Sequence, residues 1–334
     1  MAIIFSKNSG INDDMWKDTD VAVRSWMVDT DNEKNQYKDT LNAIYNVEKS
    51  DRFGEKFGSM TEFDNFEIVP EGGKSVLDDV QEGNTKLITH TQKLKGFIIT
   101  AEMLEDNNVS DMKRKAANFV RAYQRSLLQE ATDVLTGATA TSVVSLGKSH
   151  DTTAADGKAL FATNHTTIKG GYTQSNVFTN AFGTDDSMLF RLANIGKNFK
   201  NDSGHPMGFE YDTIIIPSDA PALERLILKI IGSDQQVGSA NNDINVSKNK
   251  FKLIVDPLWS KGNAATDPYI IMSSQANKEL AGNMFFDRVP LTVKEHVDEE
   301  TFNLCFNGRY RSGVGFNAWQ HILYGGAAQG TTLS

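Results

Sequence analysis

Residues Ser110–Gly137, SDMKRKAANFVRAYQRSLLQEATDVLTG, decide the fold of this chain. Ser110 and Gly137 are residue types that favour the start and the end of a helix. About 26 residues at 1.5 Å each predict a rod of roughly 40 Å, much longer than the usual globular helix. The apolar side chains recur every three or four residues, which places them on one helical face. They are Met112, Ala116, Phe119, Val120, Tyr123, Leu127, Ala131, Val134 and Leu135.

Charged side chains occupy the other face of the same stretch. The helix is therefore amphipathic, which excludes a membrane-spanning role and predicts a spine against which other elements pack. Lys113–Lys115 lie near the helix start, where the helix dipole disfavours cations. They are either a solvated surface or a contact for acidic groups of a partner. The polar face comprises Lys113, Arg114, Lys115, Arg121, Arg125, Glu130 and Asp133.

The composition is that of a globular protein with a large core, because 39% of the 334 residues are hydrophobic and 23% are charged. We expect two closely associated domains or one elaborated domain. No apolar run approaches the roughly 18 residues of a membrane-spanning helix. The single cysteine, Cys305, excludes an intramolecular disulfide and fits a reducing cytoplasm.

The net charge of −9 argues against a dedicated nucleic-acid-binding module, which would normally have a basic surface. It is compatible with a protein that only surrounds nucleic acid. A lining with few cations would let DNA slide without tight binding, since such binding requires many contacts to phosphate.

The segment before the spine contains two features that suggest contacts with another chain. Residues 1–50 are predicted to form an extended polar arm with short helical pieces, one of them around Tyr37–Tyr45. Trp16 and Trp26 in this arm pack against either a neighbouring subunit or the core of their own chain. Phe66–Thr100 is predicted to form a long hairpin with little core of its own. Because an isolated two-stranded ribbon is marginal in water, we expect another chain to stabilise it; an ordinary surface loop is the alternative.

The segment after the spine mixes helices with short strands, so the fold class is α+β. Thr184 and Ser218 are predicted to cap two helices, the second of which ends at Gly232. An Asn307-Gly308 pair between two strand-like runs predicts a hairpin with a type I′ turn. Strands are predicted at Tyr211–Ile216, Phe251–Val255, Tyr269–Met272 and Val289–Val293.

No motif for catalysis, cofactor binding or metal binding is found. His165, in TNHTT, is interpreted as a loop histidine with local hydrogen bonds, because no nucleophile motif accompanies it. Cys305 lies in a predicted strand and is interpreted as a buried structural thiol. Gly313 and Gly315 lack the third glycine of a dinucleotide motif and are interpreted as strand glycines that allow close approach. We therefore predict no catalytic residue, no cofactor and no metal. The six histidines are dispersed: His90, His150, His165, His205, His296 and His321.

The order of these parts resembles major capsid proteins of tailed bacteriophages of the Hong Kong 97 type, with a closer resemblance to the Mu-like major head subunit group. The resemblance covers nearly the whole chain as an order of parts. The patches that carry it are VPEGG (Val69–Gly73), EGNTKLITHTQKLKGFIITAEMLEDN (Glu82–Asn107), LTGA (Leu135–Ala138), LFATNHTT (Leu160–Thr167), TQSN (Thr173–Asn176) and GRYRSGVGFNAWQHILYG (Gly308–Gly325).

The resemblance implies a division of the chain and a mode of assembly. Some relatives cross-link through an E-loop lysine; Lys86, Lys93 and Lys95 are available, but no acceptor is identified and this chemistry is not carried over. The implied parts are an N-terminal arm over 1–65, an extended E-loop over 66–100, a peripheral (P) domain over 101–212 with the spine helix at 110–137, an axial (A) domain over 213–290, and a return to the P domain over 291–334.

The function that follows from the resemblance is that of a major capsid protein. Its copies would self-assemble into hexamers and pentamers that form an icosahedral shell around double-stranded DNA, in the host cytoplasm and then in the virion. The resemblance implies a separate scaffolding protein and a portal as partners, with decoration proteins as a further option, and no membrane. One alternative is the shell of an encapsulin-like protein compartment. The other is a hydrolase or binding protein whose site has no recognisable motif.

Overall fold

Helix α4, Val109–Thr136, is the longest helix and confirms the predicted spine. In this computed structural model, residues 13–60, 63–75, 77, 82–168, 171–236, 244–262 and 264–333 are described. The helix is capped by Asn108, whose side chain accepts a hydrogen bond from the Asp111 amide, and not by Ser110. Gly137 follows α4 with a φ of −81°, so it is not a left-handed stop. A Cβ on Gly137 would lie 2.6 Å from Val143 Cγ2, so glycine is needed there for space.

The buried face of α4 follows the predicted stripe only in part: Tyr123 and Leu127 are partly buried, whereas Gln124 and Thr132 are buried as well. Leu128 is 1% exposed, whereas Leu127 is only partly buried. Glu130, expected on the polar face, is fully buried. The N-terminal half of α4 contributes to one hydrophobic cluster and the C-terminal half to another, so this helix joins two cores.

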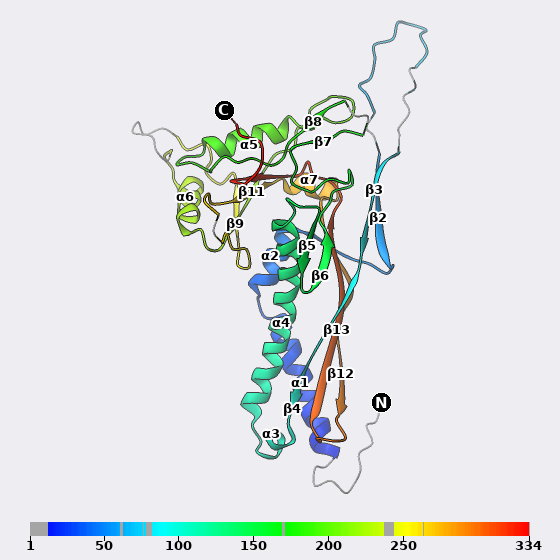
Figure 1. Ribbon diagram of the computed structural model, residues 1–334, viewed down its shortest axis with the longest axis vertical. Helices are drawn as coiled ribbons and strands as arrows, with labels where there is room; N and C mark the ends of the chain where they lie inside the picture. Colours follow the sequence, from blue (N-terminus) through cyan, green and yellow to red (C-terminus); the bar gives the residue numbers. More distant parts are fainter. Residues whose placement is uncertain are drawn as a thin grey trace.

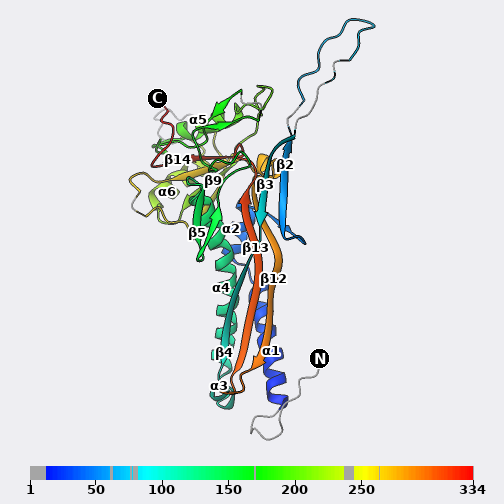
Figure 2. The same ribbon diagram turned by 45° about the vertical axis from the view of Figure 1, so that its right-hand side comes forward.

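A four-stranded sheet covers α4, in the order β1-β12-β13-β4. The hairpin of β12 and β13 and its antiparallel neighbour β4 run beside α4 as one elongated unit, which we call the stem (Figures 1 and 2). The short α3, Ala101–Glu105, connects β4 to α4 at the far end of the stem. The strands are β1, Asn46–Lys49; β4, Thr91–Ile99; β12, Asn283–Val297; and β13, Leu304–Phe316.

The predicted turn at Asn307-Gly308 is wrong. Both residues lie inside β13, opposite Lys294 and Val293 of β12, and the chain reverses instead between β12 and β13, where Phe302 has a φ of +53°. Gly308 serves packing: a Cβ on it would lie 2.4 Å from Cζ of Phe119 on α4. Glycine is therefore needed at position 308 because helix α4 approaches closely, and not because the chain turns there.

The expected extended arm is mostly helical. Helix α1, Asp13–Asn32, packs along α4, and α2, Gln36–Ile44, confirms the short helix predicted around Tyr37–Tyr45. Trp26 packs against the hydrophobic cluster of the stem, so its contact is with the chain's own core. The side chain of Trp16 lies outside the described residues. This arm therefore completes the stem.

The predicted hairpin over Phe66–Thr100 is also wrong in its pairing. Strand β3, Glu82–Thr89, pairs with β2, Gly54–Met60, whereas β4 leaves this pair and joins β13 in the stem. We call β2, β3 and the described residues between them the ribbon (Figure 1). The two-residue period of a strand does not reveal its partner, which is why β4 was assigned to the hairpin.

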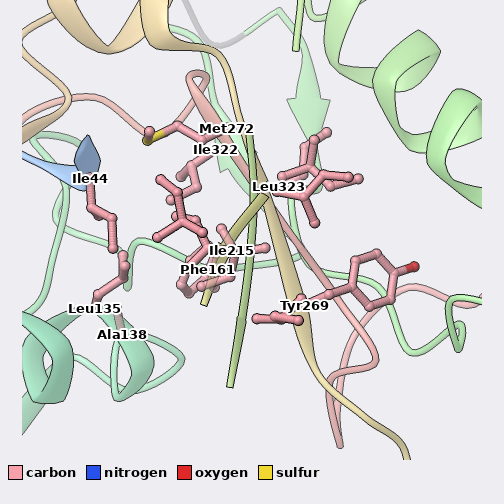
Figure 3. Packing of buried hydrophobic residues seen from close by; sticks show 14 of the residues in the cluster. Ile44, Leu135, Ala138, Phe161, Ile215, Tyr269, Met272, Ile322 and Leu323 are labelled. Atoms are coloured by element: carbon pink, nitrogen blue, oxygen red, sulfur yellow. The ribbon is translucent and has the colours of Figure 1, made fainter. Parts of the chain in front are cut away.

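The remaining elements form a second unit, which we call the head, around a sheet ordered β10-β9-β11-β14. The predicted strand at Tyr269–Met272 is confirmed without a shift. Isoleucines, leucines and aromatic residues from this sheet pack with Ile44 and Leu135, so the head core continues into the top of the spine (Figure 3). The elements are β9, Thr213–Pro217; β10, Lys252–Asp256; β11, Tyr269–Met272; β14, Ile322–Gly325; α5, Ser187–Lys197; α6, Pro221–Gly232; and α7, Ser274–Glu279.

Two small β-hairpins lie outside the two four-stranded sheets. One comprises β5, Ser142–Ser145, and β6, Lys148–Asp151, and it packs against the end of α4. The other comprises β7, His165–Thr166, and β8, Thr173–Gln174. Together with the two four-stranded sheets and the helices, they make an α+β fold, as predicted.

Candidate functional site

The histidines do not form a site. His165 is fully buried: its Nδ1 lies 2.6 Å from Asp156 Oδ2, its Nε2 lies 3.1 Å from the Leu160 carbonyl, and its ring stacks on Trp319. The local hydrogen bonds expected of His165 are present, but the residue lies in the short strand β7 and not in a loop. In the part of the chain that the structure describes, no group of three or more histidine, cysteine or acidic side chains could hold a metal ion.

The surroundings of Cys305, Gly313 and Gly315 indicate that these residues have structural roles. Cys305 is half-buried in β13, and burial raises the pKa of its thiol, which disfavours the reactive thiolate. A Cβ on Gly313 would lie 2.6 Å from His90 Nδ1, and one on Gly315 would lie 2.9 Å from Cγ1 of Ile88. The two glycines let the base of the ribbon approach β13, which confirms the close approach expected from the sequence.

Two of the three lysines considered for cross-linking are engaged within the chain. Lys86 Nζ lies 2.6 Å from Asp151 Oδ2 and from Thr153 Oγ1. Lys93 Nζ lies 2.6 Å from both carboxylate oxygens of Glu130. Lys95 is exposed on β4. These contacts tie β3 to the β5–β6 hairpin and β4 to helix α4 of the same chain.

The Lys93–Glu130 pair is the centre of a buried polar cluster that sequence reasoning missed. Ser312 donates to Glu130 Oε2 at 2.9 Å, and His150 Nδ1 lies 3.7 Å from Glu130 Oε1. Burial lowers the pKa of Lys93, and the adjacent carboxylate opposes this effect. Burial also lowers the pKa of His150. The cluster links α4, β4, β13 and the β5–β6 hairpin, so its role is to hold four elements in one arrangement.

The root of the ribbon is also held by polar contacts. His90, between β3 and β4, is 6% exposed and its Nε2 lies 3.0 Å from Ser50 Oγ, just before β2. Arg288 donates to the Ser50 carbonyl at 3.2 Å. The two chain segments that enter and leave the ribbon are therefore fastened to each other and to β12.

Beyond this root the ribbon has almost no core. Its buried apolar contact is Ile88, which packs with Met284 and Phe286. Farther out, Phe66 and Ile68 are exposed as fully as in an extended chain, at 105% and 102%, and Leu77 is 91% exposed. Figures 1 and 2 show this region extending away from head and stem alike. Large apolar side chains exposed in this way indicate a surface meant for a partner.

The described residues combine a body with two hydrophobic cores and a projecting ribbon whose large apolar side chains are exposed. Comparison with known proteins gives the family. Residues 84–325 match the family model described as "Phage capsid protein", which covers well over half of the chain. This chain belongs to that family, and it is a structural protein of the virion capsid and not an enzyme.

Solved capsid structures share the fold. One is the capsid of an empty GTA particle, with 11% identity, a TM-score of 0.52, and 87% of this chain and 90% of that chain covered. Another is from Microbacterium phage Oxtober96, with 9% identity, a TM-score of 0.51, and 85% and 88% covered. No curated protein matches the chain. Within the described residues, no helix is long and apolar enough to cross a membrane.

Proposed function

We propose that copies of this capsid protein join into hexamers and pentamers, and that the ribbon is the element that links neighbouring copies. The icosahedral shell that they form encloses the double-stranded DNA of the phage. The observation that carries the proposal is the ribbon with its exposed Phe66 and Ile68, which no core of its own chain covers. Burying such side chains on a neighbour is favourable by about 1.5–3 kcal/mol each.

The parts implied by the resemblance can be assigned to the observed units. In this proposal the ribbon, Gly54–Thr89, is the E-loop, the stem is the P domain, and the head sheet belongs to the A domain. Strand β14 pairs with β11, so the chain after residue 291 contributes to the head as well as to the stem. The N-terminal arm corresponds to α1 and α2.

Further features of the proposal come from the resemblance and from charge. The shell is assembled in the host cytoplasm with a separate scaffolding protein and a portal, and the chain is related to Mu-like head subunits. The net charge of −9 supports enclosure of DNA without sequence-specific binding, because it disfavours tight contacts to phosphate. A nucleic-acid content of purified particles near zero, with protein cargo instead, would favour a protein compartment.

The test is to shorten the ribbon. Replacing residues 61–81 by a short glycine-serine turn leaves β4 in the stem, whereas deletion of 66–100 would remove a strand of the sheet. The shortened subunit is expected to retain its circular dichroism spectrum and thermal unfolding but to form no shells in electron micrographs. Leu228→Ser, at a residue of α6 that is 53% exposed, is the control and should assemble normally. Normal shells from the shortened chain would overturn the proposal.

A further inference from the structure

The β5–β6 hairpin, at the upper end of the spine, connects α4 to the root of the ribbon (Figures 1 and 2). On the spine side, Ser145 Oγ of β5 donates to Asp133 Oδ2 of α4 at 2.7 Å. On the ribbon side, Lys86 Nζ of β3 donates to Asp151 Oδ2 of β6 at 2.6 Å and to Thr153 Oγ1 at the same distance. We call this hairpin the clasp, because it joins α4 to β3.

The clasp contains a buried histidine. His150 of β6 is 8% exposed, and its Nδ1 lies 3.7 Å from Glu130 Oε1 of α4. Its other ring nitrogen, Nε2, is buried and has no hydrogen-bond partner among the described residues. A proton on Nε2 would therefore add a charge without an acceptor in a buried site, which is unfavourable. The neutral form of His150 is thus the form that fits the closed clasp.

The charges around His150 do not compensate for a further cation. The charged groups that face it are Glu130 of α4, Lys93 of β4 and Lys148 of its own strand. Burial lowers the pKa of His150; Glu130 opposes this effect, and the two lysines add to it. The Glu130 carboxylate is already engaged by Lys93 Nζ at 2.6 Å and by the Ser312 hydroxyl of β13 at 2.9 Å. Strand β5 has no ionisable side chain.

We propose that the clasp opens on acidification, because His150 binds a proton more readily in the open hairpin, where water surrounds it, than in the closed one. Opening moves Asp151 away from Lys86. Since a buried ammonium without its carboxylate is unfavourable, Lys86 must follow the hairpin or turn out to water, and either movement displaces β3. The clasp makes the position of the ribbon root depend on pH. This inference goes beyond the proposed function, because it concerns a single subunit before any contact with other copies.

The opening is expected on the acid side of neutrality. In the open hairpin the pKa of His150 should be near the roughly 6.5 of an unfolded chain, and in the closed clasp it is lower. The closed state therefore loses stability as the pH falls below about 6.5, and the opening equilibrium should rise on the order of tenfold between about pH 7 and about pH 5.5. Asp151 stays ionised in this range: burial alone would raise its pKa, but hydrogen bonds from Lys86 and Thr153 lower it.

Hydrogen exchange of the unassembled full-length subunit tests the clasp. The amides of β5 and β6 should be less protected than those of β11, and their protection factors should fall on the order of tenfold between about pH 7 and about pH 5.5. The fall should vanish in His150→Gln and persist in His296→Gln, a control at an exposed histidine of β12. A fall that persists in His150→Gln, or hairpin amides that exchange only together with those of β11, would overturn the inference.

A second variant leaves His150 in place. Lys148 is exposed on β6, so Lys148→Glu should retain the fold. The new carboxylate favours the protonated imidazole in the closed clasp, and the fall in protection should therefore be smaller than in wild type at low ionic strength. An equal or larger fall would exclude His150 as the group that binds the proton.

Spin labels test the link to the ribbon. Labels at Leu87→Cys of β3 and Leu228→Cys of α6, both at exposed positions, report the distance from the ribbon root to the head in a chain that also carries Cys305→Ser. The distance distribution should broaden between about pH 7 and about pH 5.5, and His150→Gln should prevent the broadening. Lys86→Met removes the ammonium that joins the two parts and should give one distribution at both pH values. A distribution that does not change with pH in the chain with His150 and Lys86 intact would overturn the link between the clasp and the ribbon.

Discussion

The stem and the ribbon are both built from long antiparallel strands, but only the stem has a core. Strand β13, paired with β12, buries Phe306 and Leu304 against α4, with Phe119, Val120 and α1 completing the cluster. The ribbon buries Ile88 at its root and little beyond it. Strand pairing alone is thus not what stabilises the stem.

The difference shows how one chain separates folding from assembly. Apolar side chains that a helix covers contribute to the stability of the subunit, whereas the exposed Phe66 and Ile68 do not; in the proposed function they contribute once a second copy covers them. Substitutions in the stem should therefore change unfolding, and substitutions in the ribbon should change only assembly. The predictions below test this separation, beginning with the largest expected effect.

Leu128→Asp should abolish folding. Leu128 is 1% exposed in the middle of the spine, and an aspartate there would be a buried charge without a partner, at a cost of more than about 4 kcal/mol. Leu127→Asp is the matched control: because Leu127 is only partly buried, that variant should lose less stability. Soluble yield and the circular dichroism of the purified subunit are the measurements. Equal behaviour of the two variants would contradict the assigned helix face.

Glu130→Ala should destabilise the subunit by about 3–5 kcal/mol, because it leaves the Lys93 ammonium buried without its carboxylate. Replacing both partners, Glu130→Leu with Lys93→Met, should cost less than the single change, since no charge then stays buried. Urea unfolding of unassembled subunits gives both values. A double variant no more stable than Glu130→Ala would show that the cluster does not act through its charges.

Acidification should destabilise the stem and head. Burial lowers the pKa of His321 to about 3, below the roughly 6.5 of an unfolded chain. The unfolded state therefore takes up the proton first, and stability falls as the pH drops from about 6.5 toward about 3. At about 1.4 kcal/mol per pH unit, the loss between pH 6 and pH 4 is about 2–3 kcal/mol.

The pKa values of His90 and His150 are also lowered, so each of these histidines adds to the loss in the same direction. Thermal unfolding at several pH values measures the slope. His321→Asn should flatten the slope even if it lowers stability at neutral pH. An unchanged slope in this variant would exclude His321 as a contributor.

Gly308→Ala should destabilise the subunit by about 1–3 kcal/mol through overpacking, because the added Cβ would lie 2.4 Å from Cζ of Phe119. Phe119→Leu in the same chain should recover part of the loss by making room. If Gly308 instead occupied a turn, no change at Phe119 could compensate. Calorimetry of the three variants distinguishes these outcomes.

Phe66→Ser with Ile68→Ser should change the stability of the unassembled subunit by less than about 0.5 kcal/mol, because both side chains are fully exposed. The same variant should fail to assemble under conditions in which wild type does. A large loss of subunit stability would show that the ribbon has an intramolecular partner and would remove the distinction between ribbon and stem.

Patterns that depend on near neighbours could be predicted from the sequence. The spine follows from the spacing of Met112, Ala116 and Phe119, and the strand Tyr269–Met272 follows from an apolar run after a proline. The α+β class was predicted from the same kind of evidence. The family was recognised from the order of such parts, and the match over residues 84–325 shows it.

Features that depend on distant partners could not be predicted. The spacing of Glu130 places it on a polar helix face, and only the arrival of β4, β13 and β6 buries it. The Asn307-Gly308 pair has turn chemistry, yet the spine uses its glycine for space. β4 has the same strand pattern whether it pairs with β3 or with β13. In each instance the deciding contact lies far away in the sequence.

His90 separates two strands that are otherwise almost continuous, since β3 ends at Thr89 and β4 begins at Thr91. A change of backbone direction at this one residue would rotate the whole of β3 about its end at Thr89. The eight residues of β3 span about 26 Å, so a rotation of about ten degrees at His90 would move the far end of the strand by about 5 Å. Such a rotation would break the packing of Ile88 on Met284 and Phe286 and the ion pair of Lys86 with Asp151. The reach of the ribbon is thus set by the packing of its own subunit.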